Sequence, residues 1–575
     1  MSGRKLQPGE TGSDLIWIKG RLLFGLRAGA VPVRTVGRII LVAEVATMTG
    51  PGVGSRPTAL FPPQTAEVAW FRLRAAASLA AFFLCAMTLL PAQGASFRVV
   101  AAQGSDVLRD PRLAEGGAVH YMRTGSVWAL YTEQVELVRV GSPAPWNPAL
   151  SVTFLHPAAG RYGGLLYQAT VSGPGITTSN RSFALLGAPA GHLVLAQSTV
   201  TPAPGGGAGV TFNGAFGNSL RLSQGKVSLL ATLDGGNTQC NPAAAGYNCE
   251  GIWYGGVGSL FLRARAGDAA PGFGVNHVLH RFSDSGNNFA PVSGGVIAFI
   301  ADVRDTVGLG TTKAIYRSAS GAPPQLLAKE GDAVPGGGTL SGLQAPSIDR
   351  HGRVAFLDNN GLYVSQAIGF RVLARRFGPA PGGGSFNQLH YPAMAGHAIA
   401  FKAELQAFTQ DAIVLETDTQ ALSILVREGD VAPNVAPNVA GMFDQFRTQA
   451  LVNACGQVAF LGLLEPGGGI TSANDAGIWV YDALGNGELI VREGQSAAAF
   501  GFAPHSVSAV HFLDDGNTAE RASLDDGGVA VFDDQSQLVF TVELSNGTDL
   551  VVAAQADQRC DPVHADGFEQ ATLAR

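Results

Sequence analysis

LLAKEGDAVPGGG (residues 326–338), followed by IDRHGRVAFL (residues 348–357), is the stretch that decides the fold. Imperfect copies of this pair recur from about residue 117 to the C-terminal part of the chain. Recurrence at a spacing of tens of residues is the signature of a repeat architecture, in which each unit buries its hydrophobic face against its neighbours. The sequence therefore predicts a tandem-repeat domain.

The first part of each unit is a strand of the form G-x-V-A-F. In GRVAF, Val354 and Phe356 point to one face while Ala355 and Leu357 point to the other, so the strand is apolar on both sides and must be covered on both. The leading Gly follows a turn, where positive φ costs a glycine little. Eight copies occur, at residues 117–121, 163–167, 225–229, 295–299, 352–356, 397–401, 456–460 and 536–540.

Two further parts complete the unit. One is a short strand that ends in an aromatic residue, at residues 126–128, 251–253, 314–316, 361–363 and 477–479, with a degenerate copy at 412–414. We expect these aromatics to fill equivalent core positions rather than to stack on a ligand. The other is a strand that runs into a Gly-Asp and Pro-Gly turn, at residues 260–272, 326–338, 372–384, 424–434 and 489–497.

The composition agrees with many short strands joined by tight turns, because the chain has 76 Gly and 31 Pro but only 14% charged residues. With three or four strands per unit and eight units, the sequence predicts an all-β fold, a β-propeller of seven to eight blades. An array of β-sandwiches and a propeller in two parts are the alternatives.

The segment 71–95 has the three parts of a secretory signal peptide. Arg72 and Arg74 precede an apolar run of about 16 residues, and residues 91–95 supply a small-residue end. A buried helix and a membrane anchor are the alternatives. We expect four regions: an N-terminal extension (1–70) that is either disordered or not translated, the signal peptide (71–95), the repeat domain (96–555) and a tail (556–575). The mature protein is then secreted or periplasmic and is not held in a membrane.

The cysteines agree with export. Once Cys85 has left with the signal, four remain, and Cys240 and Cys249 bracket a Pro- and Gly-containing loop that a disulfide can close in an oxidising compartment. Two free thiols, or half of a metal site, are the alternatives. Cys455 and Cys560 pair only by elimination.

The charge is unevenly distributed. The first 95 residues hold 10 Lys and Arg and 4 Asp and Glu, so the remaining residues hold 28 and 40 and carry a net charge of −12. An acidic body lacks the basic stripe that a phosphate backbone requires, which excludes a nucleic-acid partner.

The repeat resembles the bacterial exported family known as choice-of-anchor tandem-repeat NxxGxxAF proteins. The resemblance covers about residues 117–555 and rests on D/N-x-x-G-x-V-A-F, G-I-W/Y and L-V-R-E-G-D-x-A-P taken together. It implies an exported repeat domain of unknown function, with no catalytic residues to transfer. The C-terminal residues 560–575 lack the apolar helix and basic cluster of a sorting anchor.

The sequence contains no G-x-S-x-G, H-E-x-x-H or Walker A motif, so no catalytic residue and no resident cofactor is predicted. Asp268, Asp332 and Asp430 recur in the Gly-Asp turns, where they either cap the turn or form an acidic rim for Ca²⁺ or sugar hydroxyls. His277 and His280 are a close histidine pair without a third metal ligand nearby. A further acidic cluster lies at Asp514, Asp515, Asp525, Asp526, Asp533 and Asp534.

These observations favour an exported, non-catalytic binding scaffold rather than an enzyme, with an extracellular polysaccharide or protein as its partner, because loops on a rigid scaffold are where binding concentrates. The alternative is an extracellular propeller-type glycan hydrolase or lyase whose acidic residues are dispersed along the chain.

Overall fold

The computed structural model describes residues 95–557, with gaps at 104–105, 115–116, 126–127, 162–163, 215, 217–219, 224, 245, 257, 283–291, 294, 320, 345, 407–409, 418–420, 436–440 and 513–530. All described residues belong to one compact unit, Leu90–Arg575. The predicted N-terminal extension, the signal peptide up to residue 94, and residues 558–575 of the predicted tail lie outside them. Within the described part of the chain, no helix has the length and hydrophobicity needed to cross a membrane.

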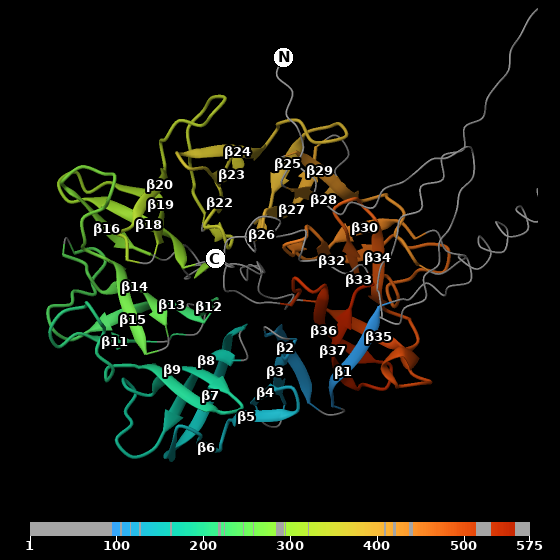
Figure 1. Cartoon of the computed structure of the whole chain (residues 1–575), viewed down its shortest axis with the longest axis horizontal. Helices are drawn as coiled ribbons and strands as arrows, with labels where there is room; N and C mark the ends of the chain where they lie inside the picture. The colour runs from blue at the N-terminus through green and yellow to red at the C-terminus, as the bar shows by residue number, and fades with distance from the viewer. Residues whose placement is uncertain are drawn as a thin grey trace, which may run out of the picture. The chain divides into compact units, whose positions relative to one another are not determined.

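Eight antiparallel sheets of four or five strands are arranged around a common axis (Figure 1), which confirms the all-β propeller. We number these blades 1 to 8 in chain order. The first four contain β2 (Val107–Leu113), β3 (Val119–Thr124), β4 (Ala129–Thr132) and β5 (Val135–Arg139); β6 (Pro143–Ala144), β7 (Asn147–Arg161), β8 (Gly164–Ser172), β9 (Ser182–Ala188) and β10 (Gly191–Gln197); β11 (Thr211–Asn213), β12 (Leu220–Ser223), β13 (Lys226–Asp234), β14 (Glu250–Gly256) and β15 (Ser259–Arg265); and β16 (His277–Arg281), β17 (Val292–Ser293), β18 (Val296–Asp305), β19 (Thr311–Ala319) and β20 (Gln325–Lys329).

The last four blades follow the same plan. They contain β21 (Ser347–Ile348), β22 (Val354–Leu357), β23 (Gly361–Ser365) and β24 (Phe370–Arg375); β25 (Phe386–Leu389), β26 (Ala393–Ala395), β27 (Ala398–Leu405), β28 (Gln410–Glu416) and β29 (Leu422–Arg427); β30 (Phe443–Phe446), β31 (Leu451–Val452), β32 (Val458–Leu464), β33 (Ala476–Tyr481) and β34 (Gly487–Arg492); and β35 (Val507–His511), β36 (Gln537–Leu544), β37 (Asp549–Gln555) and β1 (Ser96–Gln103). The 3₁₀ turn η2 (Ala497–Phe500) precedes β35.

The ring is closed by the N-terminal strand. β1 pairs antiparallel with β37, from Ser96 opposite Gln555 to Gln103 opposite Asp549, so the first described strand is the outer strand of the last blade. This pairing leaves β37 without an open edge, which is how a propeller avoids strand-to-strand aggregation.

The predicted G-x-V-A-F segments contribute to one strand in every blade: β3, β8, β13, β18, β22, β27, β32 and β36. We call this the second strand of the blade, counting the segments that lead into it from the preceding blade as one, and we call the strand that follows it in the chain the third strand. In β22, Val354 and Phe356 pack with residues of blade 4, whereas Ala355 and Leu357 pack with residues of blade 6. All four side chains are buried. The prediction that this strand is covered on both faces is therefore confirmed, and the core lies in the layers between neighbouring sheets.

The aromatic residue of the third strand stacks on the aromatic residue of the second strand. Phe299 stacks on Tyr316, Phe356 on Tyr363 and Phe460 on Trp479, with ring centroids 5.4, 5.3 and 6.4 Å apart. The predicted core role of these aromatics is confirmed. One prediction was wrong: in blade 1 the stacked residue is Tyr131, on Tyr121, whereas Trp128 lies three residues earlier and is 39% exposed.

In blades 3, 4 and 7 the polar atom of this aromatic ring bonds the Pro-containing turn that precedes its own blade, whereas in blade 5 Tyr363 Oη donates to Asp358 Oδ1. Trp253 Nε1 donates to the carbonyl of Pro204 at 2.9 Å, and Tyr316 Oη donates to the carbonyl of Pro271 at 3.2 Å. A buried indole or phenol needs such a partner. The aromatic strand and the Pro-Gly turn of the repeat are thus parts of one contact.

The turn before the second strand explains the Gly of the motif. Asp349 Oδ1 accepts hydrogen bonds from the backbone N–H groups of His351 and Arg353, at 2.9 and 2.8 Å. Gly352, between them, has φ of +75°, a conformation that favours glycine. In the copies that lack this Gly, Gly396 takes the positive φ in place of His397, and Ser536 adopts a φ of +63° itself.

Replacing Trp253 by Phe removes the hydrogen bond to the Pro204 carbonyl and shortens a fully buried side chain, so we expect a loss of about 1–3 kcal/mol in unfolding free energy. Urea unfolding followed by circular dichroism measures it. The matched control is Trp128→Phe, an exposed site where the change should stay within about 0.5 kcal/mol. Equal effects of the two variants would contradict the role of this contact.

His120 gives the fold a predictable acid sensitivity. It is buried in β3, its Nδ1 lies 2.7 Å from Thr132 Oγ1, and burial together with the nearby Arg112 lowers its pKa to about 4. The unfolded chain binds the proton near pH 6.5, so stability is lost as the pH falls from 6.5 to 4, by roughly 3 kcal/mol. As the pH falls from 6.5 to 4, the melting temperature of His120→Gln should decrease less than that of the wild type. The melting temperature of the control variant His505→Gln should decrease as much as that of the wild type.

Candidate site at the seam between the first and last blades

The Asp residues of the Gly-Asp turns cap the strand that precedes them. Each accepts a hydrogen bond from the backbone N–H three residues earlier, at 3.0, 2.9 and 2.9 Å for Asp268, Asp332 and Asp430. They follow β15, β20 and β29, in three different blades, so the structure does not bring them together. Their role in the turn is confirmed, and Ca²⁺ binding by them stays a prediction.

The Glu beside this Asp also bonds the backbone. Glu330 Oε1 accepts from Gly342 N at 2.8 Å and Glu330 Oε2 accepts from Lys313 N at 3.2 Å, which joins blade 4 to the segment that leads into blade 5. Burial raises the pKa of the equivalent residues Glu428 and Glu493. Glu330 thus joins two neighbouring parts of the fold.

The other candidates are also used by the fold. His277 packs on Phe273 and His280 on Tyr247, so the two imidazoles have different neighbours. Asp533 Oδ1 accepts from two turn N–H groups. Asp514, Asp515, Asp525 and Asp526 lie outside the described residues. Among the residues that are described, no group of three or more His, Cys, Asp or Glu is placed to hold a metal ion.

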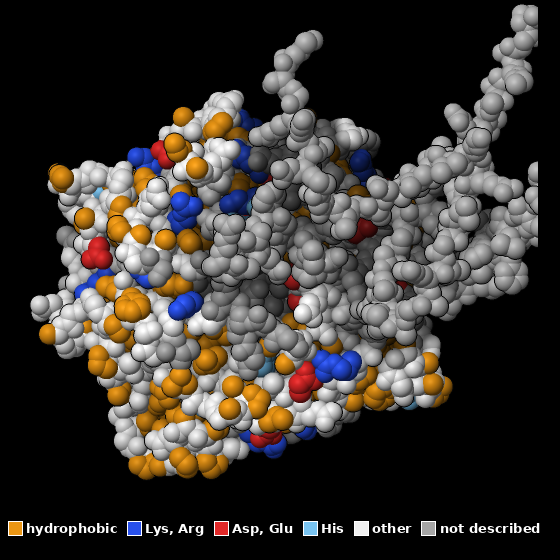
Figure 2. Space-filling view, viewed as in Figure 1, with side chains coloured by type: hydrophobic (Ala, Val, Ile, Leu, Met, Phe, Trp, Pro, Cys, Tyr) orange, Lys and Arg blue, Asp and Glu red, His pale blue; other side chains and the backbone are white. Residues whose placement is uncertain are grey.

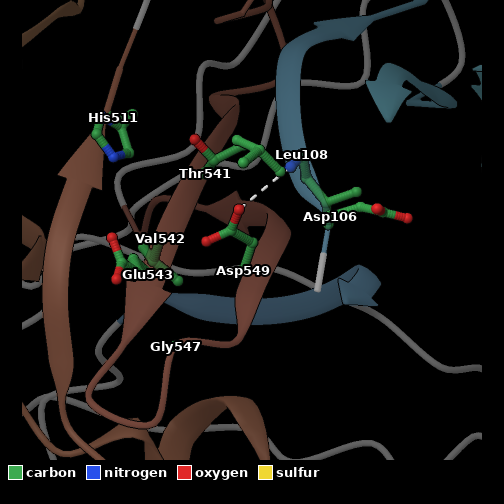
Figure 3. Close-up of a pocket in the computed structure, with 9 residues that line it drawn as sticks. Asp106, Leu108, His511, Thr541, Val542, Glu543, Gly547 and Asp549 are labelled. Carbon is green, nitrogen blue, oxygen red and sulfur yellow. Dashed lines mark hydrogen bonds between the residues drawn. The ribbon is translucent and has the colours of Figure 1, made fainter. Parts of the chain in front are cut away.

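A pocket of about 260 Å³ opens where blade 8 meets blade 1 (Figure 3). Its walls come from the start of β2 and from the ends of β35, β36 and β37, so it exists only because the ring closes. The polar and charged lining residues are Asp106, His511, Thr541, Glu543 and Asp549, and the others are Val107, Leu108, Val542 and Gly547. Sequence reasoning missed this site.

The pocket has an acidic wall. Glu543 and Asp549 are directly opposite each other on β36 and β37 and therefore share one face of the sheet. Burial raises the pKa of Asp549, the Glu543 charge raises it further, and the Leu108 N–H, which donates to Asp549 Oδ2 at 3.3 Å, opposes the rise. Asp106 is neutralised by Arg123, whose Nε lies 2.6 Å from Asp106 Oδ2. The remaining acidic side chains of the pocket are Glu543 and Asp549, and Arg109 and His511 lie close enough to lower the pKa of Asp549.

An exposed aromatic pair lies at the next seam. Trp128, just before β4, and Phe154, on β7, have ring centroids 6.1 Å apart and are 39% and 42% exposed. The sequence could have raised the question whether Trp128 is the core aromatic, because Tyr131, three residues later, is a second candidate for the core position and is the one that stacks on Tyr121.

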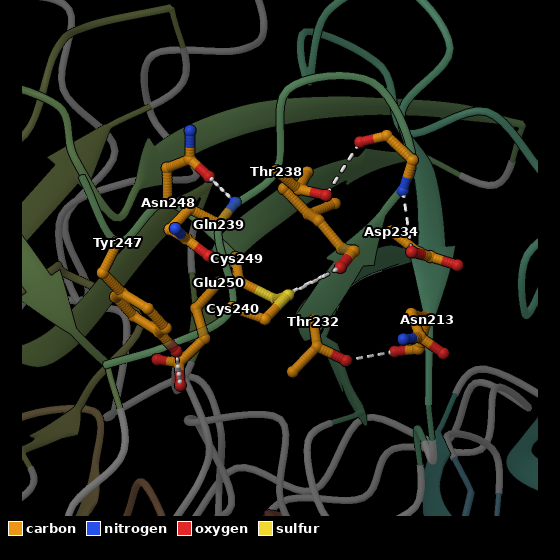
Figure 4. Close-up of a disulfide and its surroundings, with 12 residues drawn as sticks. Asn213, Thr232, Asp234, Thr238, Gln239, Cys240, Tyr247, Asn248, Cys249 and Glu250 are labelled. Carbon is orange, nitrogen blue, oxygen red and sulfur yellow. Dashed lines mark hydrogen bonds between the residues drawn. A yellow bond between two sulfur atoms is a disulfide. The ribbon is translucent and has the colours of Figure 1, made fainter. Parts of the chain in front are cut away.

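The predicted disulfide is present in blade 3 (Figure 4). Cys240 and Cys249 are bonded, with their Cα atoms 4.8 Å apart, and close the loop between β13 and β14. Asn248 Oδ1 accepts from Gln239 N at 2.6 Å within the same loop. Cys455 is also disulfide-bonded, and its predicted partner Cys560 lies outside the described residues.

On the face shown in Figure 2, the described Lys and Arg side chains are scattered among acidic, hydrophobic and other residues and form no continuous basic stripe. A nucleic-acid surface requires such a stripe.

The model of a family of unknown function (DUF7453) matches residues 239–435 and 357–555, which together are more than half of the chain. This confirms the expected membership of a family without an established activity, while kinship with the choice-of-anchor family stays a prediction. No curated protein matches the chain.

Three solved structures are similar in fold. They are the α-L-arabinanase of Penicillium chrysogenum (9% identity, 56% of this chain and 98% of that chain, TM-score 0.25), the Hadza microbial sialidase Hz136 (9%, 61% and 71%, 0.26) and the acylaminoacyl peptidase of Pyrococcus horikoshii (9%, 76% and 57%, 0.32). These similarities carry no argument about function.

Asp549 and Asp332 should respond oppositely to mutation. Because the pKa of Asp549 is raised, its charge opposes folding at neutral pH, and Asp549→Asn keeps an acceptor for Leu108 while removing that charge. We expect this variant to melt higher at pH 7. Asp332→Ala should cost about 1 kcal/mol through the lost turn bond, and the control Asp332→Asn should cost less. A lower melting temperature for Asp549→Asn would mean that the charge of Asp549 stabilises the fold.

Proposed function

We propose, from the premise that the chain belongs to the family of unknown function DUF7453, that it is an exported, non-catalytic binding protein. Its propeller is a rigid scaffold, and its ligand occupies the pocket between blades 8 and 1. Because a ring of packed sheets is rigid, the pocket is already ordered before the ligand binds, and little free energy of binding is lost in ordering it.

One observation carries this proposal: the use of the carboxylates differs between the repeat turns and the seam. In the turns, residues such as Asp332 and Glu330 accept hydrogen bonds from backbone N–H groups within the fold. At the seam, Asp549 also accepts a backbone N–H, that of Leu108, but Asp549 and Glu543 in addition place two like charges side by side on the wall of an open recess. Like charges directly opposite on a sheet are destabilising, which supports a functional reason for this pair.

The lining favours a ligand that is cationic or rich in hydroxyl groups. Carboxylates accept strong hydrogen bonds from hydroxyl and ammonium donors and repel anions. The chain after residue 95 carries a net charge of −12, which disfavours acidic partners further. An extracellular polysaccharide without acidic groups fits this chemistry.

Export is supported by the disulfide between Cys240 and Cys249, because such bonds persist in oxidising compartments. The signal-like segment 71–95 points in the same direction. We therefore place the protein in the periplasm or outside the cell.

A glycan hydrolase or lyase is the second candidate, and one observation favours it. Glu543 and Asp549 form a pair of carboxyl groups, and Asp549 has the raised pKa expected of a general acid. Residues directly opposite in a sheet have Cβ atoms about 4.5–5.5 Å apart. A glycosidase uses such a pair of carboxyl groups, one as general acid and the other as nucleophile or general base.

Thermal shift assays test the proposal. The probes are neutral hexasaccharides (cellohexaose, maltohexaose and chitohexaose), the cation spermine and anionic hexagalacturonate. We expect at least one neutral or cationic probe to raise the melting temperature, hexagalacturonate to leave it unchanged, and the variant Glu543→Gln/Asp549→Asn to lose the rise.

Two results would count against binding at the seam: no stabilisation by any probe, or stabilisation that the double variant retains in full. Chromatography of the same saccharides after incubation separates the two candidates. Cleavage that Glu543→Gln abolishes would replace the binding role by the hydrolase role.

A further inference from the structure

The exposed pair Trp128 and Phe154 differs from the aromatic residues at the repeated core position. Trp253 and Trp479 are fully buried at the repeated core position. Trp128 and Phe154 instead keep 39% and 42% of their surface exposed while contacting each other. Leaving a large aromatic surface in water forgoes the free energy of burying it, so an exposed pair that is also ordered by contact indicates an interaction surface.

Trp128 occupies the same place in blade 1 as Asp549 does in blade 8. The cross-strand pairs Tyr121–Tyr131 and Phe540–Val552 are equivalent, and each lies three residues beyond Trp128 or Asp549. This place reaches the strand of the following blade that precedes its G-x-V-A-F strand: Asp549 bonds the N–H of Leu108 on β2, and Trp128 contacts Phe154 on β7. The acidic pocket and the aromatic pair therefore lie at successive seams, at the same end of blade 1.

The two features are linked through the end of β3. Asp106, which lines the pocket, is held by Arg123, and Thr124 Oγ1 donates to the carbonyl of Val107 at 3.3 Å. Gly125 follows with a φ of +142°, and a Cβ atom there would lie 2.3 Å from Asp106 Oδ1. Gly125, three residues before Trp128, therefore lies against Asp106, which lines the pocket.

A carboxylate wall beside an exposed aromatic surface matches the two sides of a sugar. The hydroxyl groups at the edge of a sugar ring donate to carboxylates, whereas the C–H groups on its face are apolar and pack on an aromatic ring. A ligand that uses both features must extend from one seam to the next. That requirement favours a chain of sugars over a single sugar or a compact cation.

We propose that Trp128 and Phe154 form a stacking subsite for a neutral oligosaccharide whose hydroxyl groups bind Glu543 and Asp549, an inference that rests on the proposed binding function. Sugar units that carry carboxylate or sulfate are excluded by the charges of Glu543 and Asp549. The subsite selects for chain length, because only an oligosaccharide contacts both seams.

Isothermal titration of the full chain with cellohexaose, maltohexaose and chitohexaose tests the subsite, with the matching disaccharides for comparison. For the saccharide that binds, we expect Trp128→Ala and Phe154→Ala each to weaken affinity about tenfold, and Trp128→Phe to weaken it less. The matched control is Phe261→Ala, because Phe261 is 56% exposed on β15 in blade 3. Disaccharides should bind more weakly, and Trp128→Ala should change their affinity little.

The outcomes separate this inference from the proposed function. If Trp128→Ala and Phe154→Ala bind hexasaccharide as the wild type does, while Glu543→Gln/Asp549→Asn does not, the stacking subsite is wrong and the pocket stands. If spermine stabilises the protein through the pocket and no saccharide binds, the oligosaccharide is wrong and the binding function stands. If all these variants bind normally, both are wrong.

Discussion

The structure depends on one constraint: the second strand of each blade has no polar face. In β22, Val354 and Phe356 need one neighbouring sheet and Ala355 and Leu357 need the other, so a blade cannot exist alone. The other parts of the repeat serve this arrangement. Trp253, on a third strand, donates a hydrogen bond to the Pro204 carbonyl of a turn, and Glu330, in a turn, accepts one from Gly342 N in the segment that leads into the next blade. Hydrophobic burial supplies the stability, and these polar contacts fix how the sheets are positioned.

Much of this could be predicted from the sequence because it is local and repeated. The spacing of GRVAF and its copies predicts the repeated strand and the number of blades. Asp and Gly are residues that favour turns, as in the turn from Asp349 to Gly352. Cys240 and Cys249 are close in the chain, so their disulfide was predictable. Trp128 was wrongly assigned to the core position because the sequence contains two aromatic residues close together, Trp128 and Tyr131, and does not show which of them is in the core. Only the pairing of Tyr131 with Tyr121 shows which of the two is in the core.

The seam pocket could not be predicted for a different reason. It joins residues about 440 positions apart, such as Leu108 and Asp549, and nothing local in either segment indicates the other. The repeat itself was also misleading, because its regular carboxylates at Asp268, Asp332 and Asp430 belong to turns. The two features that we propose to bind a ligand occupy one structural place whose residue varies between blades. That place holds Asp549 in blade 8, Trp128 in blade 1 and Lys313 in blade 4, on a scaffold that stays constant.

The pairing of β1 with β37 also sets the order in which the molecule can be finished. Among the described strands, β1 is synthesised first and β37 last, so their pairing cannot form until synthesis of all eight blades is complete. Loop closure over such a separation is slow and comes late in folding. Until then the edges of β1 and of the newest blade are unpaired and can pair prematurely with other strands.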